Sequence, residues 1–173
     1  MKFNKDAIQL RLVSEDDAAF ILKLRLDSRY SQFLSKVNGD IQSQIEWIKS
    51  YKKEENAGVQ YYFIIVRNDQ TPCGTVRLYD FQIDSFCWGS WILNEEKTRR
   101  AALESAFKVY DYGFNKLGFK KSHFDVMKNN EKVVKFHLRM GAVVTHEDED
   151  NFYFTISRES VMQAWLDLRS VIG

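Results

Sequence analysis

The chain has 173 residues, of which 45% are hydrophobic, 28% charged and 14% aromatic. This length is typical of one domain that can bury a sizeable core, and the hydrophobic content excludes an intrinsically disordered protein. Lys and Arg number 25 against 24 Asp and Glu, a formal net charge of +1, which argues against a generic nucleic-acid-binding protein. We expect one domain over residues 1–173 and no nucleic-acid partner.

The two cysteines, Cys73 and Cys87, are too few for a disulfide framework and have no neighbouring ligand pair for zinc. We predict two buried free thiols, no metal site and a reducing compartment. The first ten residues lack the apolar core of a signal peptide, and no stretch approaches the roughly 20 apolar residues of a membrane span. These patterns predict a cytoplasmic protein that does not enter a membrane.

Hydrophobic periodicity predicts strands and helices along the whole chain. Residues 8–12 alternate apolar and polar side chains, as in a half-buried strand, and Ser14 with Asp17 forms a capping-box pattern at the start of a helix. The predicted strands are 8–12, 61–66, 74–79, 86–93, 122–127, 142–145 and 152–156. The predicted helices are 14–26, 41–55, 98–117, 131–140 and 157–171.

The order of these elements indicates the fold class. Residues 61–93 read as an antiparallel meander, and the strand–helix–strand unit that follows requires a parallel pair. We therefore expect a mixed α/β (α+β) domain with one mixed sheet of about seven strands flanked by helices. Trp47, Trp88 and Trp91 are expected in its core.

The segment between the strand ending at Leu93 and the helix starting near Thr98 could bind an anion. A helix N-terminus offers unpaired N–H groups and a positive dipole end. Lys97, Arg99 and Arg100 add positive charge there. A pyrophosphate could be held at this point without a conventional P-loop, and the alternative is a solvated helix start.

Three segments of the second half, with the opening segment 10–17, carry a resemblance to a known family. Residues 110–118 read YDYGFNKLG, residues 125–130 read DVMKNN, and residues 136–142 read FHLRMGA. In this order and spacing they resemble the GNAT superfamily of N-acetyltransferases. Within this superfamily the sequence is most similar to the branch that contains the ribosomal-protein N-terminal acetyltransferases and the amino-sugar acetyltransferases. The resemblance extends to about Ile156.

The resemblance implies an acyl-CoA N-acyltransferase-like fold and transfer of the acetyl group of acetyl-CoA to a primary amine. It implies that pantetheine pairs with the backbone of residues 91–93, that the pyrophosphate sits over the N–H groups of residues 98–102, and that Asn130 contacts the cofactor. His137 falls where many members place a tyrosine general acid, and the alternative is a packed core residue. The implied cofactor-binding set, with the cations of the loop, is Trp91, Ile92, Leu93, Lys97, Thr98, Arg99, Arg100, Ala101, Ala102 and Asn130.

Asp80 and Asp125 are candidates for the base that receives the proton of the amine, because a carboxylate can serve that role. The alternative is a turn residue for Asp80 and a hydrogen-bonding acid for Asp125. We expect the acceptor to meet the polar stretch 25–47, whose cations Arg25, Arg29 and Lys36 could bind a phosphorylated group.

Three readings of the function remain open from the sequence. The resemblance favours a nucleotide-linked amino sugar as the acceptor over the N-terminus of a protein. Thr98 and Arg100 stand where the family commonly has glycines, which motivates a third reading, a non-catalytic ligand-binding or interaction domain on the same fold. An exposed strand edge or the last helix could build a homodimer.

Overall fold

The computed structural model describes residues 7–37 and 39–172, with side chains to Leu168. Within this part of the chain the strands are β1 (Ile8–Leu12), β2 (Tyr61–Arg67), β3 (Pro72–Tyr79), β4 (Ser85–Leu93), β5 (Lys121–Met127), β6 (Val143–Glu147) and β7 (Asn151–Ser157). The helices are α1 (Ala18–Leu26), α2 (Ser28–Ser31), α3 (Ile41–Asn56), α4 (Ala101–Asp111), α5 (Glu131–Arg139) and α6 (Arg158–Ile172). A 3-10 turn, η1 (Glu15–Asp17), precedes α1, and a π-helical turn, η2 (Tyr112–Lys116), extends α4.

These strands form one seven-stranded sheet in the order β1-β2-β3-β4-β5-β7-β6. Neighbours are antiparallel except β4 and β5, which are parallel. The predicted mixed sheet, the meander and the parallel pair are therefore confirmed. None of the helices of residues 7–37 and 39–172 combines the length and the apolar character needed to span a bilayer.

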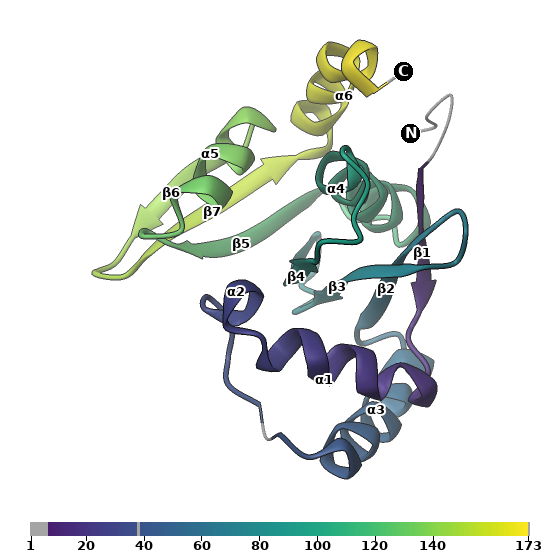
Figure 1. The fold of residues 1–173 in the computed structure, drawn as a ribbon. Helices are drawn as coiled ribbons and strands as arrows, with labels where there is room; N and C mark the ends of the chain where they lie inside the picture. Colours follow the sequence, from purple (N-terminus) through teal and green to yellow (C-terminus); the bar gives the residue numbers. More distant parts are fainter. Residues whose placement is uncertain (1–6, 38, 173) are drawn as a thin grey trace.

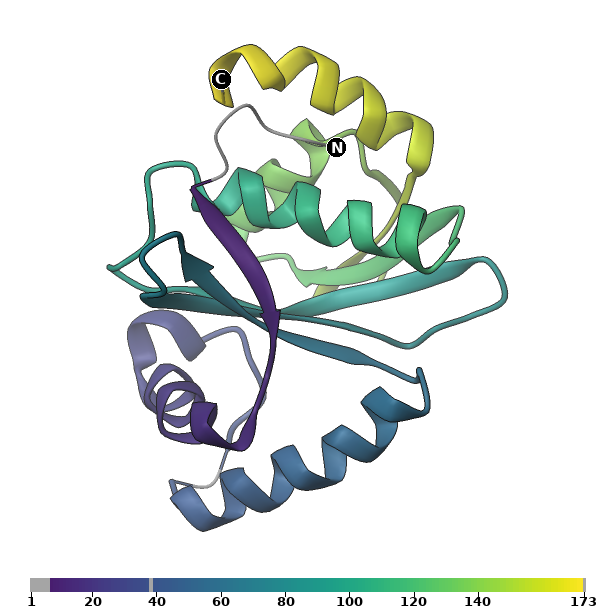
Figure 2. The ribbon, with the colours of Figure 1, turned by 90° about the vertical axis from the view of Figure 1, so that its right-hand side faces the viewer.

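Helices cover both faces of the sheet, α1 and α3 on one and α4 and α6 on the other (Figure 2). The side chains of β2 alternate between the two layers: Phe63 and Ile65 join the core under α4 and α6, whereas Tyr62, Ile64 and Val66 join the core under α1 and α3. A central strand buried on both faces explains the continuous apolar run in the sequence.

Two local differences from the sequence prediction lie next to the site. The prediction has no counterpart to α2, which Asp27 caps by accepting a hydrogen bond from the backbone N–H of Arg29. The helix predicted from residue 98 begins at Ala101, because Arg100 has φ −107° and ψ 2° and no side chain caps the helix there. The loop after β4 is consequently three residues longer than predicted, 94–100.

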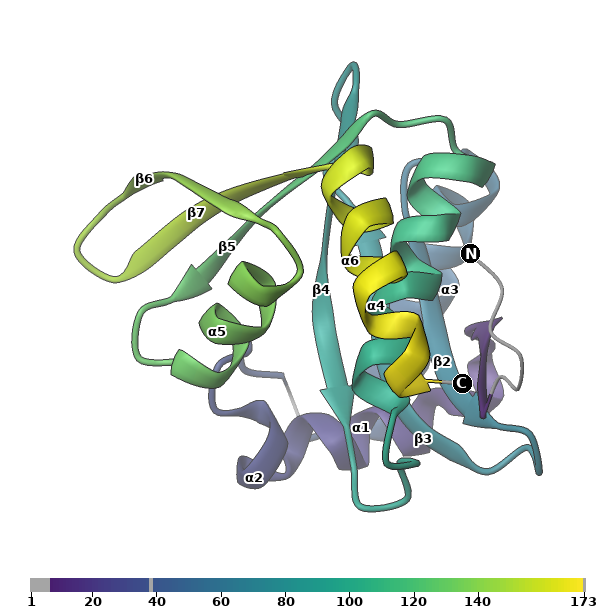
Figure 3. The same ribbon diagram turned by 90° about the horizontal axis from the view of Figure 1, so that it is seen from above.

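The two halves of the sheet part between β4 and β5. These strands pair only through Ser85 with Lys121 and Phe86 with Ser122, at their first residues. Further along they diverge (Figure 3), while β5 stays paired with β7 over its full length. The strands β5, β7 and β6 thus form a separate wing that carries α5 (Figure 1). The widening space is bordered by unpaired backbone groups of β4.

Gly74 lets β3 lie against the unpaired end of β4. A Cβ atom at this position would be 2.1 Å from the backbone oxygen of Ile92, a contact that no rotamer change can relieve. We expect Gly74→Ala to lower the free energy of unfolding by about 1–3 kcal/mol, the usual cost of overpacking. Chemical denaturation measures this loss.

Gly39→Ala is the matched control, because a Cβ there would meet only Leu26 carbons at 3.8 Å and 3.9 Å, which are ordinary contacts. An equal loss of stability in both variants would contradict the steric explanation. Unchanged stability in Gly74→Ala would contradict it as well.

Candidate active site

A cleft of 520 Å³ occupies the space between the diverging strands. Its walls are residues 88–93 of β4, residues 124–127 of β5, and α2 with the residues that follow it. The other lining residues are Ala102, Asn130, Lys132, Val133 and His137. The predicted residues Trp91, Ile92, Leu93, Ala102, Asn130, Asp125 and His137 are therefore brought together in one cleft.

A β-bulge at Ser90 shapes the β4 wall. The register places Thr75 opposite Ile92 and Arg77 opposite Gly89, so Ser90 and Trp91 both face Val76. Ser90 has a positive φ of 48°, and its carbonyl accepts a hydrogen bond from Thr75 Oγ1 at 2.9 Å. A bulge interrupts the ladder and redirects the backbone. The sequence prediction does not include this bulge, although a glycine inside a strand, here Gly89, often marks one.

The loop of residues 94–100 leads from this wall to the start of α4. The side chains of Lys97, Arg99 and Arg100 are exposed there, and α4 begins without a side-chain cap. Thr98 Oγ1 is buried without a hydrogen-bond partner beside this helix start. Helix-start N–H groups, an unpartnered hydroxyl and three cations suit a phosphate group. Neither Thr98 nor Arg100 lines the cleft, which stays open.

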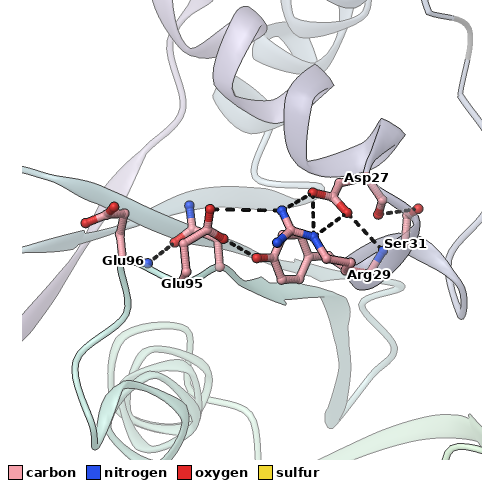
Figure 4. Close-up of polar contacts among 7 residues, drawn as sticks. Asp27, Arg29, Ser31, Glu95 and Glu96 are labelled. Atoms are coloured by element: carbon pink, nitrogen blue, oxygen red, sulfur yellow. Dashed lines mark hydrogen bonds and ion pairs between the residues drawn. The ribbon is translucent and has the colours of Figure 1, made fainter.

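Polar contacts tie the short helix α2 to this loop (Figure 4). The hydroxyl of Tyr30 donates to the carboxylate of Glu95, and Arg29 Nη2 lies 2.6 Å from Asp27 Oδ2 and 4.0 Å from Glu95 Oε1. Arg29 and Tyr30 also line the cleft. Because 65 residues separate Tyr30 from Glu95, no local pattern in the sequence could indicate this contact.

His137 of α5 lines the cleft. Its ring packs against a side chain of each strand, with ring centroids 5.4 Å from Trp88 of β4 and 4.2 Å from Phe124 of β5. The residue is only 4% exposed, and Nδ1 is buried without a hydrogen-bond partner. Burial lowers the pKa of His137 to about 3, because the charged ring would lose its hydration. The imidazole is therefore neutral near pH 7.

Asp125 and Asn130 face the cleft from its β5 side. Asp125 is an exposed residue of β5, and Asn130 precedes the first residue of α5 without capping it through its side chain. The carboxylate and the amide are thus available to a ligand in the cleft.

Asp80, the other candidate base, lines neither this cleft nor the second cavity described below. Its Oδ2 is 2.9 Å from His123 Nε2, and His123 Nδ1 is 2.9 Å from Ser85 Oγ. The set resembles a serine triad with the two ring nitrogens exchanged, since a triad places the acid on Nδ1. Ser85 is 1% exposed and Asp80 lines neither cavity, so this cluster offers no accessible nucleophile.

A second cavity, of 370 Å³, lies on the other side of Ser90, between α1, α3 and β3. Ser90 lines both cavities, so they adjoin at the bulge. The other lining residues are Ile21, Arg25, Ser35, Lys36, Val37, Ser43, Gln44, Trp47, Tyr62 and Arg77. The prediction that Trp47 lies in the core is wrong: it is 40% exposed and borders this cavity. The predicted cations Arg25 and Lys36 are here, whereas Arg29 lines the cleft.

The two adjoining cavities could each hold a ligand, with Ser90 at their shared border. Ala102 of α4, Asp125 and His137 all line the cleft, so a long ligand in it would reach from the start of α4 to these two side chains. A second, polar ligand fits the adjoining cavity. Among the described residues no group of three or more His, Cys, Asp or Glu side chains is placed to hold a metal ion.

Comparisons with known proteins agree with this geometry. Apo FdhC, a nucleotide-linked sugar GNAT, is 50% identical with a TM-score of 0.89, and the match covers 100% of this chain and 99% of FdhC. Ribosomal-protein-S5-alanine acetyltransferase from Vibrio fischeri is 17% identical with a TM-score of 0.76, over 92% of this chain and 97% of that one. Spermidine N-acetyltransferase from Vibrio cholerae, in complex with CoA and spermine, is 20% identical with a TM-score of 0.76, and the match covers 91% of this chain and 99% of that one. The last two show the fold alone.

A comparison with curated protein sequences gives no significant match. Residues 8–143, however, match the acetyltransferase (GNAT) domain family. The resemblance seen in the sequence is therefore confirmed. The chain belongs to the GNAT acetyltransferase family and is an acetyl-CoA-dependent N-acetyltransferase.

Proposed function

We propose that the protein transfers the acetyl group of acetyl-CoA to the primary amine of a nucleotide-linked amino sugar. One observation carries the proposal: the cleft between β4 and β5 meets a polar, cation-lined cavity at the bulge of Ser90. The 50% identity to a nucleotide-linked sugar GNAT over the full length supports the acceptor class.

The residues around the cleft fit acetyl-CoA, which supplies an acetyl thioester when bound. The backbone of Trp91, Ile92 and Leu93 lies where β4 has no partner from β5 and can pair with the amides of pantetheine. The N–H groups of Thr98, Arg99, Arg100 and Ala102 and the cations Lys97, Arg99 and Arg100 can hold the pyrophosphate. The N–H of Ala101 donates to the carbonyl of Thr98 at 3.1 Å. Asn130 can hydrogen-bond the part of the cofactor that passes the start of α5.

We assign the proton handling to two residues of the cleft. Asp125 would accept the proton that the attacking amine releases when the new C–N bond forms and the C–S bond breaks. His137, being neutral, would donate a hydrogen bond from its ring N–H to the departing sulfur and thus stabilise the developing thiolate. The thiolate then takes its proton from water. A cytoplasmic location and a homodimer stay predictions.

The acceptor class can be tested by following the release of free thiol from acetyl-CoA in the presence of a panel of amines. The panel contains nucleotide-linked amino sugars, the corresponding free amino sugars, spermidine and a peptide with a free N-terminus. We expect the highest kcat/KM with a nucleotide-linked amino sugar. Preference for the peptide or the polyamine would overturn the acceptor class, and absence of thiol release with every nucleotide-linked amino sugar would overturn it as well.

Replacing Asp125 by Asn tests the proposed base. The substitution removes the proton acceptor and keeps the size of the side chain, so kcat should fall about 10²–10⁴-fold, the usual contribution of general acid–base catalysis. The dissociation constant of acetyl-CoA, measured by isothermal titration, should not change. Asp80→Asn provides the comparison, because Asp80 lines neither cavity. Loss of activity in Asp80→Asn with full activity in Asp125→Asn would reverse the assignment.

The low pKa of His137 has a measurable consequence for stability. The unfolded chain binds a proton on this histidine below about pH 6.5, whereas the folded chain does so only below a pKa of about 3. Stability should therefore decline as the pH falls through this window. Between about pH 7 and about pH 5, the titration of His137 should lower the free energy of unfolding by about 2 kcal/mol. His137→Phe, which fills the same space without a titratable group, should lose this dependence.

Chemical denaturation at the two pH values measures this difference. His146→Phe is the matched control, because His146 is exposed in the β6–β7 hairpin, and it should keep the dependence of the wild-type protein. If His137→Phe keeps that dependence as well, His137 titrates in the folded protein at the same pH as in the unfolded chain. The lowered pKa of His137 would then be excluded.

A further inference from the structure

The cavity between α1, α3 and β3 carries positive charge without compensation. Arg25, Lys36 and Arg77 line it, and none of its described lining residues is acidic. No described carboxylate forms an ion pair with any of the three. Cations that gather in a partly desolvated pocket repel one another, and such an arrangement is stable when an anion joins it.

The two arginines are held in place but are not saturated with hydrogen bonds. Arg25 Nη2 donates to Ser35 Oγ at 2.8 Å, and the guanidinium of Arg77 lies over the ring of Tyr79, 4.4 Å from its centroid. The Nε atoms of both are buried without a partner. Burial, and then the charge of Arg77, lower the pKa of Arg25, so the two guanidinium groups lie within electrostatic reach of each other.

The chemistry of these groups identifies the anion. A guanidinium presents a planar fork of N–H donors that matches two oxygens of a phosphate. Two such forks with a lysine suit a diphosphate better than a single carboxylate, because their combined charge exceeds that of one carboxylate. Trp47 stacks on Tyr51 with a centroid distance of 5.7 Å and exposes its indole at the same cavity. An exposed indole is a suitable surface for a flat ring such as a nucleobase.

The position of Arg77 connects this anion to the reaction. Arg77 pairs with Gly89 across β3 and β4, next to the bulge of Ser90 where the two cavities meet. An anion on Arg77 therefore lies beside the point at which an amine would enter the cleft. This fits an acceptor whose amine and diphosphate are separated by one sugar ring.

We propose that Arg25 and Arg77 bind the diphosphate of the acceptor and thereby set the preference of the enzyme for nucleotide-linked sugars over free amino sugars. This inference rests on the proposed function and deepens it. The two arginines are specificity-determining residues that contact the acceptor at a distance from the reacting atoms.

Arg77→Gln is the sharper test, because Arg77 donates no hydrogen bond that holds a loop, whereas Arg25 fixes Ser35. We expect the KM for the nucleotide-linked amino sugar to rise about ten- to hundredfold, the effect of losing hydrogen bonds to a charged group. The KM for acetyl-CoA and the kcat/KM for the free amino sugar should stay within about threefold of the wild-type values. Arg77→Lys keeps the charge but loses the planar fork of N–H donors. Its KM for the nucleotide-linked amino sugar should therefore lie between those of the wild-type enzyme and Arg77→Gln.

Arg139→Gln is the control, because Arg139 is exposed on α5 outside both cavities and its loss changes the net charge equally. If the wild-type enzyme uses nucleotide-linked sugars and Arg77→Gln leaves their KM unchanged, this inference is overturned while the proposed function stands. An equal rise of the KM in Arg139→Gln would also overturn it, because the effect would then reflect net charge.

A binding measurement separates the two proposals if the enzyme acetylates no nucleotide-linked sugar. UDP, dTDP and inorganic pyrophosphate are titrated into the wild-type protein and into Arg77→Gln. Binding of a nucleoside diphosphate that weakens at least about tenfold in the variant would support the anion site even without turnover. Absence of binding to the wild-type protein, or equal binding to both, would overturn it. Binding of pyrophosphate as tight as that of UDP would show that the base contributes nothing and would overturn the role given to Trp47.

Discussion

The short pairing of β4 with β5 is the constraint on which the rest of the structure depends. After two residue pairs the strands separate, and the aromatic ring of His137 lies in the gap between Trp88 and Phe124. Beyond these two pairs β5 offers no partner to β4, so the later residues of β4 keep N–H and C=O groups without a strand partner on this side. Such groups are costly when buried and useful when a ligand can pair with them. The early end of this pairing therefore opens the cleft and leaves a binding surface along β4.

The bulge at Ser90 determines how the two cavities meet. Because Ser90 and Trp91 share one partner on β3, the β4 backbone turns at this point, and Ser90 borders the cleft as well as the second cavity. A cofactor that runs along residues 91–93 and an acceptor held near Arg77 thus approach the same place from opposite sides. The contact of Tyr30 with Glu95 fixes α2, one wall of the cleft, to the loop that leads to α4. Residues from one segment, 25–37, line both cavities.

The sequence predicted most of the fold because its elements have clear local signals. The alternation in residues 8–12 and the continuous apolar run at 61–66 each identify a strand. The residues themselves indicated only the cations Lys97, Arg99 and Arg100 at a helix start, whereas the family resemblance supplied the roles of residues 91–93, Asn130 and His137. Three features depend on distant parts of the chain: the partner of Tyr30, the register shift at Ser90 and the exposure of Trp47. Asp80 and Asp125 both lie on or after strands, and only the sheet order shows that Asp125 faces the cleft.

His137 illustrates how one residue can serve the fold and the reaction through the same property. A ring at the junction of two diverging strands must be apolar enough to pack against Trp88 and Phe124, and a neutral imidazole meets that condition whereas a charged one does not. The lowered pKa keeps the ring neutral over the pH range in which proteins function. A neutral imidazole still carries one N–H donor. Phenylalanine would satisfy the packing and a charged histidine would offer a stronger acid, whereas a neutral histidine combines a buried aromatic ring with an N–H donor in the lining of the cleft.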